Sequence, residues 1–148
     1  MNIKRGKMKD RELTVGYKKK KIKLFLKECN FLEKGTGLMF SQRETAKNLL
    51  FSFRDKQRIM IHSFFVFYPF LAIWTDEKNN ALEIEVVKPF NPCVCPKKES
   101  LNLIEIPVNR KNKSIIKFFF GDSDKLGRFP SVTKGLNTSF NNILYLKR

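Results

Sequence analysis

The sequence predicts a mainly β protein, a compact antiparallel and barrel-like sheet with one or two short helices. Hydrophobic residues make up 42% of the 148-residue chain and charged residues 30%, which is a globular composition. Phenylalanine occurs 15 times, against one tryptophan and three tyrosines, and aromatic side chains favour strands and a well-filled core. Short apolar or alternating segments also recur between turn-forming residues. The length suits one domain spanning residues 1–148.

Seven segments have the apolar content or the alternation of strands. They are residues 13–17, 22–27, 49–53, 59–67, 70–75, 82–87 and 101–106. The first two are expected to form a hairpin over 13–28. In the last, the alternation places Leu101, Leu103 and Glu105 on one face. Phe118 to Phe120 are also interpreted as strand residues, ended by Gly121-Asp122.

Turns and one helix are predicted between these strands. Ser41-Gln42-Arg43-Glu44 is a capping-box sequence, in which the serine caps an amide and the glutamate reaches back, so a short helix is expected over 42–48. Residues 54–58 and 76–80 are polar and are expected to be turns. Residues 143–146 are expected to be an edge strand or a docking tail.

The longest apolar run extends from Ile59 to Trp74. A membrane-spanning helix needs about 20 predominantly apolar residues, whereas this run has 16 and contains Pro69. Two buried strands separated at Tyr68-Pro69 are therefore the favoured interpretation, and a membrane span is the less favoured one. Residues 1–23 are basic and have no apolar segment typical of a signal peptide.

Positive charge is concentrated at the two ends of the chain. The net charge is +16, made up of +8 over residues 1–34, +1 over 35–96 and +7 over 97–148. Such an excess destabilises a folded chain by self-repulsion, which a polyanionic partner would offset. The ends are therefore interpreted as contact surfaces, with simple solvated faces as the alternative.

Four segments occur in an order that suggests a family. They are Gly37-Leu38-Met39-Phe40, Leu49 to Phe53, Ile61 to Pro69, and Leu103-Ile104-Glu105-Ile106-Pro107. Together they resemble the domain-of-unknown-function 192 family in its archaeal-like form, over about residues 31–122. The resemblance implies a compact, mainly β domain with little helix and no established reaction. The basic N-terminal and C-terminal parts of this chain extend beyond that family-like core. Where the family usually has an acid two residues after the proline, this chain has Leu71, so a shared activity that needs the acid would be lost.

Few residues suggest catalysis or metal binding. His62 is the only histidine, and it is interpreted as a hydrogen-bonded, partly buried side chain, with a pocket formed by His62, Phe64 and Pro69 as the alternative. Cys29, Cys93 and Cys95 form no disulfide framework and lack the spacing of a zinc site. Glu83 and Glu85 are interpreted as a solvated strand face. No catalytic residue, metal or cofactor is therefore predicted.

Two basic clusters are the predicted nucleic-acid-binding residues. They are Lys18, Lys19, Lys20, Lys21 and Lys23, and then Arg110, Lys111, Lys113 and Lys117. Lysines neutralise phosphates without reading base sequence, and neighbouring aromatic rings can stack on unpaired bases. Because lysine outnumbers arginine, contacts to the phosphate backbone are expected rather than base readout.

These observations favour a non-enzymatic, basic binding protein associated with RNA or the ribosome. The alternative is an enzyme or small-ligand-binding protein that uses a pocket near His62. Attachment to an anionic membrane ranks last, because no basic amphipathic helix is evident. The free cysteines and the high lysine content fit a reducing, cytoplasmic setting.

Overall fold

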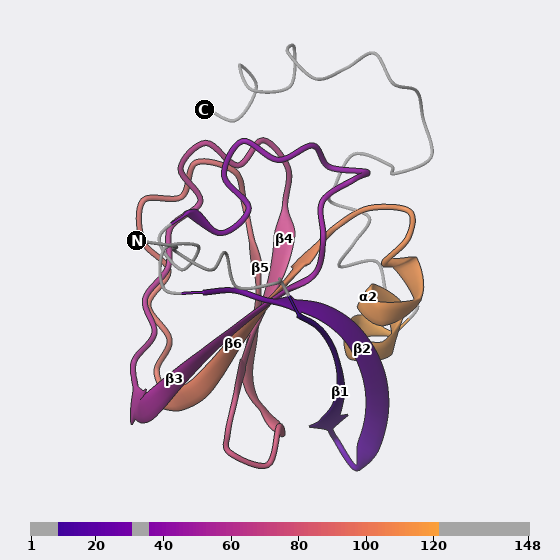
Figure 1. Ribbon diagram of the computed structural model, residues 1–148, viewed down its shortest axis with the longest axis vertical. Helices are drawn as coiled ribbons and strands as arrows, with labels where there is room; N and C mark the ends of the chain where they lie inside the picture. The colour runs from indigo at the N-terminus through magenta and orange to yellow at the C-terminus, as the bar shows by residue number, and fades with distance from the viewer. Residues whose placement is uncertain (1–8, 31–35, 122–148) are drawn as a thin grey trace, which may run out of the picture.

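The computed structural model describes residues 9–30 and 36–121, which form one strongly curled six-stranded sheet (Figure 1). The strands, in their order across the sheet, are β1 (Asp10–Tyr17), β2 (Lys20–Glu28), β3 (Leu49–Gln57), β6 (Ser100–Pro107), β4 (Phe70–Thr75) and β5 (Ala81–Val87). All neighbouring strands are antiparallel except β2 and β3, so the sheet is mixed. The prediction of a mainly β, barrel-like fold is confirmed: residues 9–30 and 36–121 form a half-barrel accompanied by one short helix.

The expected hairpin at the start of the chain is formed by β1 and β2. Its two turn residues, Lys18 and Lys19, both have left-handed backbone angles, with φ of 45° and 63°. Two-residue hairpin turns of this kind match the twist of the strands that they join. The second hairpin, β4–β5, turns at Asp76, whose Oδ1 accepts hydrogen bonds from the amides of Lys78 and Asn80 at 2.9 and 2.8 Å.

The two edge strands of the sheet meet at one end of the half-barrel. The amide of Gly16 in β1 donates to the carbonyl of Asn79, at the turn before β5, across 3.1 Å. A Cβ atom on Gly16 would lie 2.6 Å from Oδ1 of Asn80, so a larger residue here would have to displace the side chain of Asn80. The curl of the sheet therefore brings its first and last strands together at that end.

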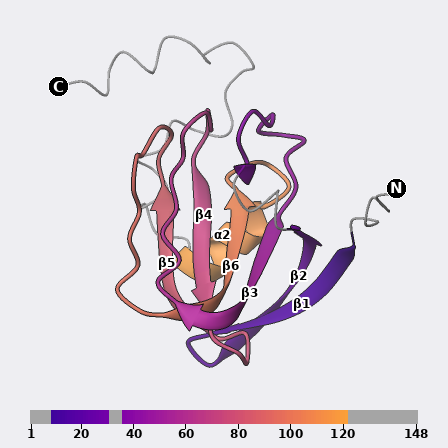
Figure 2. The ribbon, with the colours of Figure 1, turned by 60° about the vertical axis from the view of Figure 1, so that its left-hand side comes forward.

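One face of the sheet packs against the helix α2 (Lys113–Phe120). Side chains of β1, β2, β3, β4 and β6, among them Leu24 and Ile106, pack with Phe119 of the helix in a buried cluster. Figure 2 shows α2 behind β4 and β6, with the β1–β2 hairpin curling away to one side. The strand predicted over Phe118–Phe120 is wrong, because Ile116 and Phe119 lie three residues apart on the buried face of a helix.

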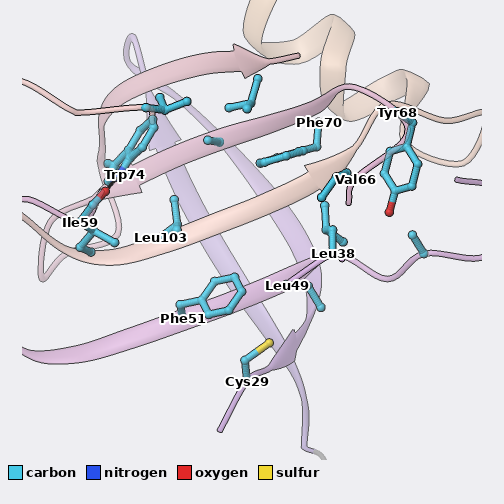
Figure 3. Packing of buried hydrophobic residues seen from close by; sticks show 14 residues of the cluster. Cys29, Leu38, Leu49, Phe51, Ile59, Val66, Tyr68, Phe70, Trp74 and Leu103 are labelled. Atoms are coloured by element: carbon cyan, nitrogen blue, oxygen red, sulfur yellow. Dashed lines mark hydrogen bonds between the residues drawn. The ribbon is translucent and has the colours of Figure 1, made fainter. Parts of the chain in front are cut away.

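The opposite face of the sheet is covered by loops rather than by a helix. Residues 36–48, 58–69 and 88–99 enclose a second cluster that contains Phe51, Trp74 and Leu103 (Figure 3). The buried indole of Trp74 donates from Nε1 to the carbonyl of Ile59 across 2.9 Å. This bond fixes the loop over residues 58–69 to the core.

The strand predicted over residues 59–67 is wrong. Its backbone groups pair with the neighbouring loop instead of with the sheet, and the buried Ser63 organises that pairing. The amide of Ser63 donates to the carbonyl of Asn91 at 2.8 Å, and its hydroxyl donates to the carbonyl of Lys88 at 2.6 Å. The apolar run therefore crosses the outside of the core, where Phe64, Phe65 and Phe67 are exposed.

Two smaller predictions also fail. The helix expected over 42–48 is only a turn, in which the amide of Ala46 donates a hydrogen bond to the carbonyl of Gln42 at 2.8 Å. The hydroxyl of Ser41 does not cap a helix, because it is hydrogen-bonded to the hydroxyl of Tyr68 and the carbonyl of Leu38. The polar turn expected over 54–58 is wrong because residues 54–57 extend β3. The segment 143–146 lies outside the described residues.

Candidate functional site

The side chain of Phe25 lies exposed in the middle of β2. Because strand side chains alternate, Leu24 and Leu26 enter the core while Phe25 points outward between Lys23 and Lys27. The ring is 73% exposed, which is high for a phenylalanine. Lys23 also pairs with Glu12 on β1 at 2.9 Å, an exposed contact of little energetic weight. An aromatic ring between lysines on a sheet face is suited to base stacking.

A shallow pocket of about 370 Å³ adjoins Phe25. Its lining residues come from both basic parts of the chain and from the loop between them: Asp10, Phe25, Leu26, Lys27, Ala46, Lys47, Asn48, Lys111 and Asn112. Lys47 and Lys111 are exposed there, and with Lys27 they make the pocket cationic despite Asp10. A pocket of this size can hold one base or phosphate group.

The floor of this pocket is held by a pair of asparagines. Nδ2 of Asn48 donates to Oδ1 of Asn112 at 3.1 Å, and Nδ2 of Asn112 donates back to Oδ1 of Asn48 at 2.8 Å. Asn112 also donates to the carbonyl of Pro107 at 2.8 Å. These bonds join the segment before β3 to the segment between β6 and α2, and they place Lys47 beside Lys111.

The structure places the predicted basic residues in four parts of the molecule. Lys111 lies in the pocket, and Lys21 and Lys23 share the outward face of β2 with Phe25. Lys18, Lys19 and Lys20 lie at the far end of the hairpin, and the ammonium of Lys18 is 5.1 Å from the ring centre of Tyr17. Lys113 and Lys117 lie on the exposed side of α2, and Arg110 is exposed just before it.

Glu105 is a second unusual group. It lies on β6 between Leu49 and Ala72 of the flanking strands, and only 6% of it is exposed. Gly37, with φ of 49°, covers it so closely that a Cβ atom there would be 3.1 Å from Oε2. Burial raises the pKa of Glu105 to about 8, and among the described residues no hydrogen bond or cation opposes the shift. The carboxyl group is therefore mostly neutral at pH 7 and able to donate a hydrogen bond.

Tyr68 lies close enough to Glu105 to feel its charge. Burial raises the pKa of the Tyr68 phenol, the hydrogen bond with Ser41 opposes that rise, and a charge on Glu105 adds to it. Figure 3 shows Tyr68 at the edge of the cluster, beside Val66 and Leu38. Glu105, Tyr68 and Ser41 thus form a small polar region within the loop-covered core.

The predicted pocket residues lie in the loop over 58–69. His62 is exposed, so the interpretation as a partly buried histidine is wrong, although its Nδ1 does accept a bond from the amide of Phe64 at 3.3 Å. Phe64 is 42% exposed with its ring 5.2 Å from that of His62, and Pro69 is half-buried. Cys93 and Cys95 are exposed, with their sulfur atoms 2.8 Å apart. Among the described residues no three His, Cys, Asp or Glu side chains gather as metal ligands.

Sequence reasoning did not select Phe25, Lys27, Lys47 or Glu105. The signal for Phe25 was present in the alternation Lys-Leu-Phe-Leu-Lys, which places one aromatic ring among lysines. The signal for Glu105 was also present, since one acid lay on the apolar face of a predicted strand. Lys47 had no such signal, because its approach to Lys111 depends on the asparagine pair.

Comparison with known proteins identifies a fold class. No family model matches the chain, and no curated protein matches it. A protein of unknown function from Novosphingobium aromaticivorans aligns with a TM-score of 0.58 and 15% identity, over 70% of this chain and 77% of that one. A putative transcription regulator from Sinorhizobium meliloti aligns with a TM-score of 0.57 and 14% identity, over 69% and 84%. At these identities the likeness shows the fold alone.

Proposed function

We propose that the protein is a non-enzymatic binding protein for single-stranded RNA. The observation that carries this proposal is the exposed ring of Phe25, set between Lys23 and Lys27 at the edge of a pocket that also contains Lys47 and Lys111. A stacking surface beside a row of cations is the arrangement that holds unpaired bases and their phosphates.

The chemistry of the cations favours affinity over base specificity. The pocket contains lysines and no arginine, and lysine acts on phosphate as a point charge rather than as a two-pronged donor. Asn48 and Asn112 bond each other, so their amides are already engaged. The expected ligand is therefore an unpaired RNA segment of broad sequence, and such segments in ribosomal RNA are one source.

Substitution of the aromatic ring is the first test. Phe25→Ser should weaken binding of a labelled oligouridine about tenfold in fluorescence anisotropy at physiological salt, since one base–aromatic stack contributes about 1–3 kcal/mol. Phe67→Ser removes another exposed ring, 57% accessible and remote in sequence, and should leave binding unchanged. Equal affinity of wild type and Phe25→Ser would overturn the proposal.

The lysines give an independent test through the salt dependence of binding. Each phosphate contact on a single strand contributes about 0.7 to the slope of log affinity against log salt. Lys47→Gln with Lys111→Gln should lower that slope by roughly twice this amount. Lys113→Gln with Lys117→Gln, on the outside of α2, should lower it much less. Equal slopes for the two double variants would show that binding follows net charge and not this pocket.

A further inference from the structure

Large apolar side chains are exposed on the three loops that cover the second core. Phe40 is 70% exposed, Met60 66%, Phe64 42%, Phe65 47%, Phe67 57% and Phe90 39%. Single exposed apolar residues are ordinary, but six within three adjoining loops indicate an interaction surface. We call these six residues the aromatic loop surface.

Ring and backbone contacts hold the three loops together. The amide of Phe40 donates to the carbonyl of Phe65 at 2.9 Å, and their rings stack with centres 5.0 Å apart. The rings of Phe67 and Phe90 meet edge to face at 5.3 Å, and the amide of Phe90 donates to the carbonyl of Ser63 at 3.0 Å. The surface is therefore built from all three loops and is fixed before any partner arrives.

Backbone strain accompanies this surface. Phe40, Phe65 and Phe90 have φ of 59°, 56° and 57°, in the left-handed region that bulky residues avoid. Glycine or asparagine would fit these positions at lower cost, yet each contributes an exposed ring. The loops thus keep aromatic rings at the surface at the expense of folding free energy, as expected of residues that serve binding.

The charges on these three loops are mainly positive. Residues 36–48, 58–69 and 88–99 contain six basic residues and two acids, the exposed Glu44 and Glu99. The exposed cations Arg58, Lys88, Lys97 and Lys98 are among the basic residues. Glu83, from β5, reaches this region, but its carboxylate accepts the amides of Lys97 and Lys98 at 2.9 and 3.4 Å. Exposed apolar side chains on loops with a net positive charge complement an apolar layer covered by anionic groups.

We propose that the aromatic loop surface docks on an anionic lipid bilayer. Phenylalanine rings on the loops would enter the boundary between headgroups and acyl chains, and the flanking lysines would meet anionic headgroups. RNA fits this surface less well, because Phe40 and Phe65 stack on each other and Met60 offers no ring. Within the described residues no helix is long and apolar enough to cross a membrane.

Vesicle cosedimentation tests the proposal with the full chain. The protein should bind vesicles of phosphatidylcholine with phosphatidylglycerol at physiological salt, and bind vesicles of phosphatidylcholine alone more weakly. Phe65→Gly with Phe67→Ser should reduce binding to the anionic vesicles by at least about tenfold, because two rings no longer enter the interface. The glycine suits the left-handed backbone of residue 65, so the variant should stay folded, as circular dichroism would verify.

Phe25→Ser is the matched control, since it removes an exposed ring from the RNA-binding face and should leave vesicle binding unchanged. The proposal is overturned if the wild type does not bind anionic vesicles, or if the loop variant binds them as tightly as the wild type. It is also overturned if the wild type self-associates and only the loop variant is monomeric, because a second copy would then be the partner.

Discussion

The protein exposes phenylalanine in two regions that differ in backbone and in surroundings. Phe25 lies on a regular strand between Lys23 and Lys27 and opposite Glu12 of β1, and its neighbours Leu24 and Leu26 are buried. The aromatic loop surface gathers five phenylalanines and a methionine on irregular backbone, and three of the phenylalanines have left-handed angles. The first region offers a single ring with several cations near it, whereas the second offers rings in contact with one another.

This difference shows that exposure alone does not define a binding surface. A single ring flanked by cations can stack on a planar, charged ligand. Rings that already contact each other in pairs have fewer free faces but together present a larger apolar area. The neighbours of each ring therefore distinguish the two proposed partners, and each region can be altered without touching the other.

Trp74 provides the largest expected change and would break the second region alone. Trp74→Ala should lower the free energy of unfolding by about 4 kcal/mol, since it leaves a cavity and frees the carbonyl of Ile59. Hydrogen exchange should show faster opening over residues 58–69 while the β1–β2 hairpin stays protected. Trp74→Phe, which keeps most of the volume but loses the indole donor, should cost about 1–2 kcal/mol. Equal loss of protection in the hairpin would show that both regions depend on this side chain.

The buried carboxyl group of Glu105, in the loop-covered core, should make the stability of the protein depend on pH. The pKa of this carboxyl is about 8 in the folded protein, against 4.5 in an unfolded chain. Because the pKa of Glu105 is higher in the folded protein, the contribution of this group to the free energy of unfolding is fully present below pH 4.5 and is lost as pH rises toward 8. At pH 7 the loss is about 3 kcal/mol, from roughly 1.4 kcal/mol per pH unit.

Urea unfolding of wild type and Glu105→Gln between pH 4.5 and 8 measures this contribution. The glutamine resembles the neutral carboxyl, so the variant should lose less stability as the pH rises, and the two curves should diverge. Parallel curves would mean that the carboxyl is solvated or paired in the folded state. RNA binding through Phe25 should be the same in both proteins at pH 7.

The smallest expected changes in stability come from replacing exposed phenylalanines of the loops by glycine, and they test the left-handed backbone of these residues. Phe40→Gly, Phe65→Gly and Phe90→Gly should each stabilise the fold by up to about 1 kcal/mol, because glycine adopts a left-handed backbone without steric cost. Phe67→Gly, at a residue outside the left-handed region, should instead destabilise by about 0.5–1 kcal/mol. Thermal unfolding of the four variants checks the opposite signs. Destabilisation by all four would show that ring packing outweighs backbone strain.

Local patterns in the sequence predicted most of the strands. Alternation located the β1–β2 hairpin, and the polar residues 76–80 located the turn between β4 and β5. The strand predicted over 59–67 was wrong, because composition cannot show that the backbone of Ser63 forms hydrogen bonds with residues 88–91 and not with the sheet. The helix α2 was missed since three consecutive phenylalanines suggest a strand, whereas the spacing of Ile116 and Phe119 fits a helix face.

The candidate sites were less accessible to sequence reasoning. Lys111 was predicted, but its partners Lys27 and Lys47 come from β2 and from a loop more than sixty residues before it. The aromatic loop surface was not predicted, because the sequence of these irregular loops does not show which phenylalanines are exposed and which are buried. The resemblance to the domain-of-unknown-function 192 family stays a prediction, since no family model matches the chain.

The contact between Gly16 and Asn79 bears on how the protein avoids aggregation. A curled sheet with two unpaired edges, β1 and β5, would offer both as templates for strand addition by another chain. The amide of Gly16 is already occupied by Asn79, and the nearby side chain of Asn80 fills the gap. At that end each edge blocks the other, so a foreign strand would first have to separate them.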